Sequence, residues 1–241
     1  MVSGLHPQWA SLDFDALLSL PAALLIVDAT NSVLSKDGAQ QADRLWERSR
    51  RPGGTLENTA RLVEAARAGG VRVGWFRYEY LRDHYPATPM DDAQYRYWRG
   101  GRNWTDEQKE WDSALVPELA AIQRAGDFEI LYKSFGNIFL GTPLQQMLNA
   151  WGVRTLLLAG YHLDECVEQA ARTARDLGFM PLVAADCCCC AHEGDETSTL
   201  KRIDSHWAPV ISTDHIAAII QRRLRDTRAA GPGTKVPIAT G

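Results

Sequence analysis

The sequence predicts a three-layer α/β/α fold, Rossmann-like in plan, with a mostly parallel sheet of six strands. Short apolar segments alternate with helical patterns along the chain, which is typical of a parallel sheet covered by helices on both faces. The apolar segments are continuous rather than alternating with polar residues, which indicates strands buried on both sides. A chain of 241 residues is long enough to form one such domain with a sizeable core.

Six segments have the length and continuous apolar character of buried strands. They are residues 22–29, 71–78, 128–133, 155–160, 181–187 and 207–212. Helical patterns occupy residues 56–68, 115–123, 143–150, 166–177, about 196–204 and 214–225. Thr55, Thr142 and Thr213 each stand at a predicted helix start, where a side-chain oxygen can cap free backbone N–H groups.

Two regions fall outside this pattern. Residues 79–112 are rich in aromatic residues, charges and glycine, so we predict a long loop or lid there. The tail, residues 229–241, is expected to be flexible or to reach onto a neighbouring subunit. We find no internal repeat, and residues 1–228 are predicted to form a single domain.

The overall composition argues against several classes of protein. The net charge of −4 and the sequence pI of about 5.9 give no reason to expect nucleic acid or an anionic membrane surface as a partner. No apolar run approaches the roughly 18–20 residues that cross a bilayer. The apolar stretch at 17–27 lacks the features of a signal peptide. Five cysteines, four of them contiguous, are no disulfide framework, so a cytoplasmic protein is expected.

Cys166 lies where the predicted strand 155–160 gives way to a helical pattern. From Cys166 onward apolar residues recur at helical spacing, which places the thiol near the first turn of a helix. A helix start carries partial positive charge and free N–H groups, which favour a thiolate and can also bind an oxyanion. The alternative is that Cys166 is a small buried hydrophobic residue, a common role of a free cysteine.

Two other reactive side chains stand at predicted strand ends. Asp28 follows the first apolar segment and Lys133 closes the third. Open parallel sheets place their ligands at the carboxyl ends of the strands. Asp28 can accept the thiol proton, and Lys133 can stabilise both anions. Taken singly, Asp28 could be a helix cap and Lys133 a solvated charge; together with Cys166 they form a nucleophile set.

The same residues carry a resemblance to a known family. Three segments resemble, in order, the motifs of the isochorismatase-like cysteine hydrolases: Asp28-Ala-Thr-Asn31, residues 133–144 from Lys133 to Thr142-Pro-Leu144, and Gly160-Tyr-His-Leu-Asp-Glu-Cys166-Val167. The resemblance spans about residues 20–215. Thr30 stands where the family usually has glutamine, and Leu163 stands where it usually has threonine.

The resemblance implies a role for each member of the set. Cys166 is the expected nucleophile, Asp28 the proton acceptor and Lys133 the third member of a catalytic triad. A cis peptide bond is implied between Tyr161 and His162. The backbone N–H groups of His162 and Cys166 would form the oxyanion hole. Tyr161 and His162 are bulky where the family has small residues, which alters the expected shape of the pocket floor.

The chemistry that the resemblance implies is acyl transfer at a C–N bond through a thioester intermediate. Related nicotinamidases bind zinc through an Asp-x-His-x-His cluster after the second strand, whereas residues 76–84 offer only His84. We therefore expect neither a metal nor a cofactor. The thiol argues for the amidase branch of the family. Two alternatives remain open: a hydrolase of another small substrate such as isochorismate, and a catalytically idle binding or regulatory protein.

The expected substrate is a small amide, ureide or carbamoyl compound, because residues 104–133 are similar to ureidoacrylate and biuret amidohydrolases. The candidate substrate-binding residues are Asn31, Tyr78, Tyr80, Arg82, Trp104, Phe135 and Tyr161. Aromatic and arginine side chains of this kind can hold a planar or carboxylate-bearing amide. They are equally suited to packing a lid or a subunit interface. Family members are often dimers or tetramers, so a homodimer or homotetramer is expected.

The four contiguous cysteines, residues 187–190, invite a metal or redox interpretation. Neighbouring residues of a strand point to opposite faces of the sheet, so four in a row do not converge on one ion. We therefore interpret them as packing residues.

Overall fold

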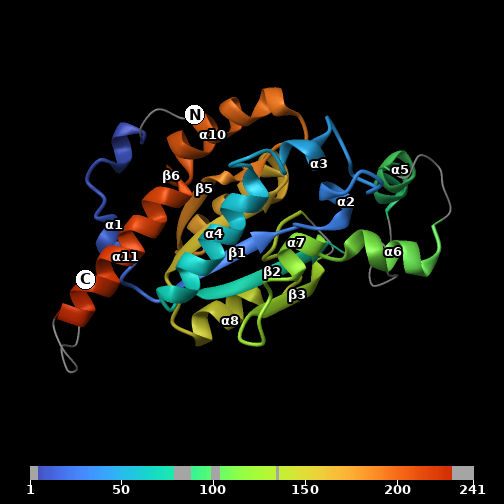
Figure 1. Ribbon diagram of the computed structural model, residues 1–241. Coiled ribbons are helices and arrows are strands. Elements are labelled where there is room, and N and C mark those ends of the chain that lie inside the picture. The colour runs from blue at the N-terminus through green and yellow to red at the C-terminus, as the bar shows by residue number, and fades with distance from the viewer. Residues whose placement is uncertain (1–4, 79–87, 99–103, 134–135, 230–241) are drawn as a thin grey trace.

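The computed structural model describes residues 5–78, 88–98, 104–133 and 136–229 (Figure 1). Its centre is a six-stranded, all-parallel sheet with the strand order β3-β2-β1-β4-β5-β6. The strands are β1 (Ala22–Val27), β2 (Arg72–Tyr78), β3 (Phe128–Lys133), β4 (Thr155–Tyr161), β5 (Met180–Cys189) and β6 (Val210–Ile211). The predicted fold class is confirmed.

The helices cover both faces of the sheet. They are α1 (Phe14–Leu17), α2 (Asn31–Leu34), α3 (Leu45–Arg48), α4 (Thr55–Ala68), α5 (Pro89–Trp98), α6 (Asp106–Ser113), α7 (Pro117–Ala120), α8 (Leu144–Ala150), α9 (Glu168–Asp176), α10 (Glu196–His206) and α11 (Thr213–Ala229). Two 3-10 turns, Pro7–Trp9 and Glu193–Asp195, and a π-type turn, η2 (Leu163–Val167), complete the set of described helical elements.

Strand β1 shows why the sheet has two cores. All its residues are buried, and successive side chains point to opposite faces. Leu24 and Ile26 pack into a first core with α4 and α11, whereas Leu25 and Val27 pack into a second core with α8 and α9. An apolar side chain at every position is therefore what a strand between two helix layers requires.

The segment 79–112, which was predicted to be a long loop or lid, is more regular than a loop. Its described parts contain α5 and α6, which project from one side of the sheet (Figure 1). Helix α6 begins at a capping box, in which Thr105 and Gln108 each accept a hydrogen bond from the other's backbone N–H. This motif is visible in the sequence. The rest of the segment, residues 79–87 and 99–103, lies outside the described residues.

Three boundaries also differ from prediction. The helix predicted at 115–123 is reduced to α7, because Leu115 forms an antiparallel bridge with Thr30. The last strand is only Val210–Ile211. Strand β5 runs two residues further than predicted, because after a shift in register its end pairs with Gly160 and Tyr161 at the end of β4.

The four contiguous cysteines divide between the two faces of the sheet. Cys187 and Cys189 belong to the first core, and Cys188 and Cys190 to the second. All four thiols are free and buried. The predicted alternation is confirmed, and these thiols do not converge on one point. No helix among the described residues is long and apolar enough to cross a membrane.

Gly160 permits a close approach between the two central strands, β1 and β4. Its φ is +130°, and a Cβ built on it would lie 2.1 Å from the carbonyl oxygen of Val27, the residue it pairs with. Because the Cβ is fixed rigidly to the main chain and would meet a backbone atom, we expect Gly160→Ala to lower the free energy of unfolding by on the order of 3–5 kcal/mol. Urea unfolding measures this. Gly126→Ala is the matched control, since a Cβ there meets no atom within 4 Å; an equal effect of both changes would contradict the expectation.

Candidate active site

Asp28, Lys133 and Cys166 meet at the carboxyl edge of the sheet. Asp28 directly follows β1 in a left-handed backbone conformation, and its N–H donates to the carbonyl of Phe76 on β2. Lys133 is the last residue of β3, and Cys166 lies in the turn η2 after β4. The sheet order places β3 two strands away from β1, so the long side chain of Lys133 spans the distance to Asp28.

The three side chains are in direct contact and almost fully buried. Lys133 Nζ lies 2.6 Å from Asp28 Oδ2 and 3.5 Å from Cys166 Sγ. Lys133 is fully buried, and Asp28 and Cys166 are exposed by 3% and 8%. The same ammonium lies 4.6 Å from the centre of the Tyr78 ring. The structure therefore brings together the three residues predicted as a triad and places Tyr78 beside them.

The charges of this cluster depend on one another. Burial raises the pKa of Asp28, although the Lys133 ammonium and the contact with the Cys166 thiol oppose that rise. Burial alone would lower the pKa of Lys133, but Asp28 and Cys166 outweigh it and the pKa is raised. Lys133 is therefore a cation at neutral pH. Oδ1 of Asp28 accepts no hydrogen bond of normal geometry from the described residues, so it can take up a proton.

Cys166 differs from the expectation of a thiolate favoured by a helix start. Burial raises the pKa of its thiol, the nearby Lys133 ammonium opposes this, and the negative charge of Asp28 adds to it. The thiol lies in the π-type turn rather than at the exposed start of an α-helix. Cys166 is thus a protonated thiol at neutral pH, and it would have to lose its proton to act as a nucleophile.

This charge state predicts how Cys166 reacts with iodoacetamide. Because the pKa of the thiol is raised, the rate of alkylation at Cys166 is expected to rise steadily from pH 7 to pH 10, without a plateau near neutrality. Mass spectrometry of labelled peptides at each pH measures the rate. Cys187, whose pKa burial raises to about 12, serves as the internal comparison. A rate for Cys166 that is already maximal at pH 7 would show a preformed thiolate instead.

The turn that carries Cys166 is held by its own backbone and by a buried carboxylate. The peptide bond between Tyr161 and His162 is cis, as the family resemblance implied. The N–H groups of Glu165 and Val167 both donate to the carbonyl of His162, at 3.2 Å. At the end of the turn, buried Glu168 accepts two hydrogen bonds from Arg202 of α10. The assignment of the His162 and Cys166 N–H groups to an oxyanion hole remains a prediction.

Two of the predicted substrate-binding side chains have other roles. Tyr161 is fully buried in the first core, and its hydroxyl donates to Thr55 Oγ1 at 2.7 Å. The prediction for the Tyr161 side chain is therefore wrong, because alternation along β4 turns the ring away from Cys166. The amide of Asn31 donates to the carbonyl of Trp111 and accepts from Ser35, so it fastens α2 to α6.

The other predicted contacts are placed only in part. Trp104 is half-buried just before α6. Tyr80, Arg82 and Phe135 lie outside the described residues. His84 lies there too. Among the residues that the structure does describe, no group of three or more histidine, cysteine or acidic side chains is placed to bind a metal.

A hollow of about 590 Å³ adjoins the nucleophile turn. Its walls are Ala39, Gln40, Gln41, Ala42, Tyr97, Trp98, His162, Asp164, Glu165, Ala191 and His192. A second hollow of the same volume lies at the amino ends of β1 and β2, around Arg67, Arg72 and Trp151. The first hollow is lined by His162, Asp164 and Glu165 from the segment that leads to Cys166, whereas the second lies at the opposite edge of the sheet. Residues 39–42 and 191–192 carry no sequence signal for lining the first hollow.

Comparison with solved structures identifies proteins of similar fold. One of them is a cysteine hydrolase from Pseudomonas syringae pv. phaseolicola. The two superpose with a TM-score of 0.71 at 18% identity, over 92% of this chain and 99% of that one. N-carbamoylsarcosine amidase from Thermoplasma acidophilum has the same fold, with a TM-score of 0.60 at 24% identity over 81% and 98% of the two chains.

The family is identified from the sequence itself. Residues 22–215 match the isochorismatase domain, so the chain belongs to the isochorismatase family of hydrolases. It is 31% identical over 190 residues to the ureidoacrylate amidohydrolase RutB of Methylorubrum extorquens, covering 75% of this chain and 73% of the relative. The corresponding protein of Klebsiella pneumoniae is 28% identical over 180 residues, covering 68% and 72%.

Proposed function

We propose that the protein is a cysteine-dependent amidohydrolase that cleaves the C–N bond of a small amide, ureide or carbamoyl compound. The observation that carries the proposal is the buried contact of Lys133 with both Asp28 and Cys166. Such a site combines a nucleophile, a proton acceptor and a fixed positive charge. The named activities of the amidohydrolase relatives support the same reaction class.

The proposed reaction begins with the protonated thiol. Cys166 Sγ attacks the carbonyl carbon while its proton passes to Asp28, and the Lys133 ammonium stabilises the sulfur as negative charge develops on it. The carbonyl oxygen becomes an oxyanion, for which the N–H groups of His162 and Cys166 are the proposed donors. The C–N bond then breaks, and the leaving nitrogen takes the proton from Asp28. Water hydrolyses the resulting thioester and regenerates the thiol.

The described walls of the hollow fit the nitrogen-bearing part of such a substrate. Gln40, Gln41, Asp164 and Glu165 offer oxygen atoms that can accept hydrogen bonds from the N–H groups of a ureide or carbamoyl compound. The hydrogen bond with His162 lowers the pKa of Glu165, which is therefore ionised at neutral pH. An amide N–H is the complementary donor for these groups.

The test is a screen for release of ammonia or amine from a panel of simple amides, N-substituted ureas and N-carbamoyl compounds at neutral pH. We expect turnover of at least one ureide or carbamoyl compound and none by Cys166→Ser. Activity that survives in the variant would contradict the cysteine mechanism. The absence of turnover on all three substrate classes would contradict the proposed reaction.

A further inference from the structure

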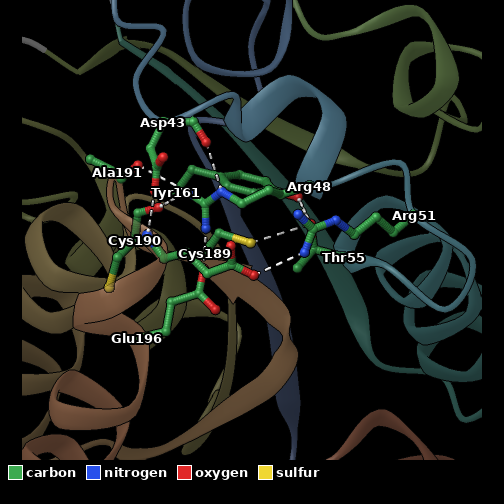
Figure 2. A network of polar contacts seen from close by, with 10 residues as sticks. Asp43, Arg48, Arg51, Thr55, Tyr161, Cys189, Cys190, Ala191 and Glu196 are labelled. Atoms are coloured by element: carbon green, nitrogen blue, oxygen red, sulfur yellow. Dashed lines mark hydrogen bonds and ion pairs between the residues drawn. The ribbon is translucent and has the colours of Figure 1, made fainter.

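Arg48, at the end of α3, is a buried arginine whose guanidinium is hydrogen-bonded on all three nitrogens (Figure 2). Nε donates to the carbonyl of Asp43 at 3.1 Å, and Nη1 to Glu196 Oε1 at 2.6 Å. Nη2 donates to the carbonyls of Cys190 and Ala191, each at 2.9 Å. Arg48 is only 6% exposed, so its charge is buried and its side chain connects neighbouring segments of the protein.

The partners of Arg48 belong to two segments that form walls of the hollow. Asp43 directly follows Ala39–Ala42 in the chain, and Ala191 is itself a wall residue next to His192. Asp43 makes a second link, because its carboxylate accepts a hydrogen bond from the N–H of Glu193 at 2.9 Å. Arg48 therefore fastens two walls that come from distant parts of the sequence.

The geometry requires an arginine. A guanidinium presents five N–H donors in a rigid plane, whereas a lysine ammonium presents three from a single point. Glu196 compensates the buried charge. Burial raises the pKa of Glu196, and the positive charge of Arg48 opposes that rise. Glu196 is also the first residue of α10, whose Arg202 binds Glu168 beside the nucleophile turn.

We propose that Arg48 is a positioning residue that sets the width of the substrate hollow, and with it the affinity for substrates larger than the reacting amide. It touches neither the triad nor the expected position of the scissile bond. Loss of the guanidinium removes the hydrogen bonds that hold residues 39–43 and 190–192 together, but it leaves Asp28, Lys133 and Cys166 in contact. The effect should therefore fall on KM for extended substrates rather than on kcat. This inference rests on the proposed function.

The experiment compares Arg48→Met and Arg48→Lys with Arg51→Met. Arg51 is the matched control, because it binds Glu193 in the same loop at 2.9 Å but both side chains are more than half exposed. For Arg48→Met we expect KM for an N-substituted urea to rise on the order of tenfold, with kcat within about threefold of wild type. KM for acetamide, which does not extend into the hollow, should change little. Arg48→Lys should recover part of the loss, and Arg51→Met should behave like wild type.

Two outcomes would overturn the proposal: an unchanged KM for the urea in Arg48→Met, or an equal loss on acetamide and the urea. Thermal unfolding of each variant identifies a simple loss of folded protein. Hydrogen exchange supplies a readout that needs no activity. Amides of residues 38–45 and 188–195 should exchange on the order of tenfold faster in Arg48→Met only. If the wild type hydrolyses no amide, the proposed function fails, and unchanged exchange in both segments would separately refute the role of Arg48.

Discussion

Replacing Cys166 with serine is expected to lower kcat for amide hydrolysis on the order of 10⁴-fold or more. A serine hydroxyl fits the space of the thiol but holds its proton far more tightly, and Asp28 is too weak a base to remove it. Lys133 Nζ, 3.5 Å from the sulfur, can stabilise the thiolate that develops during attack, but this is not enough to ionise a hydroxyl, whose pKa is far higher than that of a thiol. Steady-state release of amine from the best ureide of the screen measures the loss.

Cys187→Ser is the matched control for this change. Cys187 is fully buried, and its sulfur lies 3.1 Å from Thr213 Oγ1, a hydrogen bond that a serine hydroxyl can also make. The kcat of Cys187→Ser for amide hydrolysis is expected to stay near that of the wild type. A comparable loss in both variants would mean that buried thiols contribute through stability, and that Cys166 has no special chemical role.

Removing the charge of Lys133 is the second change with a large expected effect. Lys133→Met leaves the carboxylate of Asp28 buried without its partner at 2.6 Å, which is expected to lower the free energy of unfolding by about 3–5 kcal/mol at neutral pH. The loss should be smaller at pH 5 than at pH 8. A buried carboxyl with a raised pKa folds most favourably while protonated, so its contribution to stability declines as the pH rises. Activity should be lost as well.

The double variant with Asp28→Asn separates stability from catalysis. With both charges removed, the free energy of unfolding is expected to recover most of the loss, whereas amide hydrolysis stays absent. Urea unfolding and amine release are measured on the two single variants and the double variant. Additive losses of stability would show that the two side chains are not coupled, contrary to their contact in the structure.

Much of the fold follows from local patterns in the sequence. The run at residues 22–27 is apolar at every position because both faces of β1 are buried, and β4, which is apolar from Leu156 to Ala159, is buried along its whole length as well. Boundaries were less predictable. Leu115 looks like the start of a helix, but its bridge to Thr30, 85 residues earlier in the chain, holds it in an extended conformation. The capping box at Thr105 and Gln108 is a local signal for α6 that composition alone conceals.

The contact of Asp28, Lys133 and Cys166 was predictable because these residues stand at strand ends, which a parallel sheet brings to one edge. The walls of the hollow were not. Arg48 donates a hydrogen bond to Glu196, which lies 148 residues later in the chain. No residue pattern within either segment predicts this pairing. Tyr161 shows a different limit. The motif gives its position next to the cis peptide, but the alternation of β4 decides that its ring packs beside Leu157 and Ala159 in the first core.

The position of Lys133 has a consequence for how activity appears during folding. In the described sheet strand β3 is an edge strand that pairs with β2, yet it supplies the cation of the proposed catalytic cluster. Edge strands with a single neighbour are the parts of a sheet most able to detach locally. A chain with its four central strands assembled but β3 undocked would present a thiol and a carboxylate with no ammonium between them. The appearance of enzymatic turnover during refolding would then report the docking of β3. A measurement of total secondary structure would not distinguish this step, because the other strands are already formed.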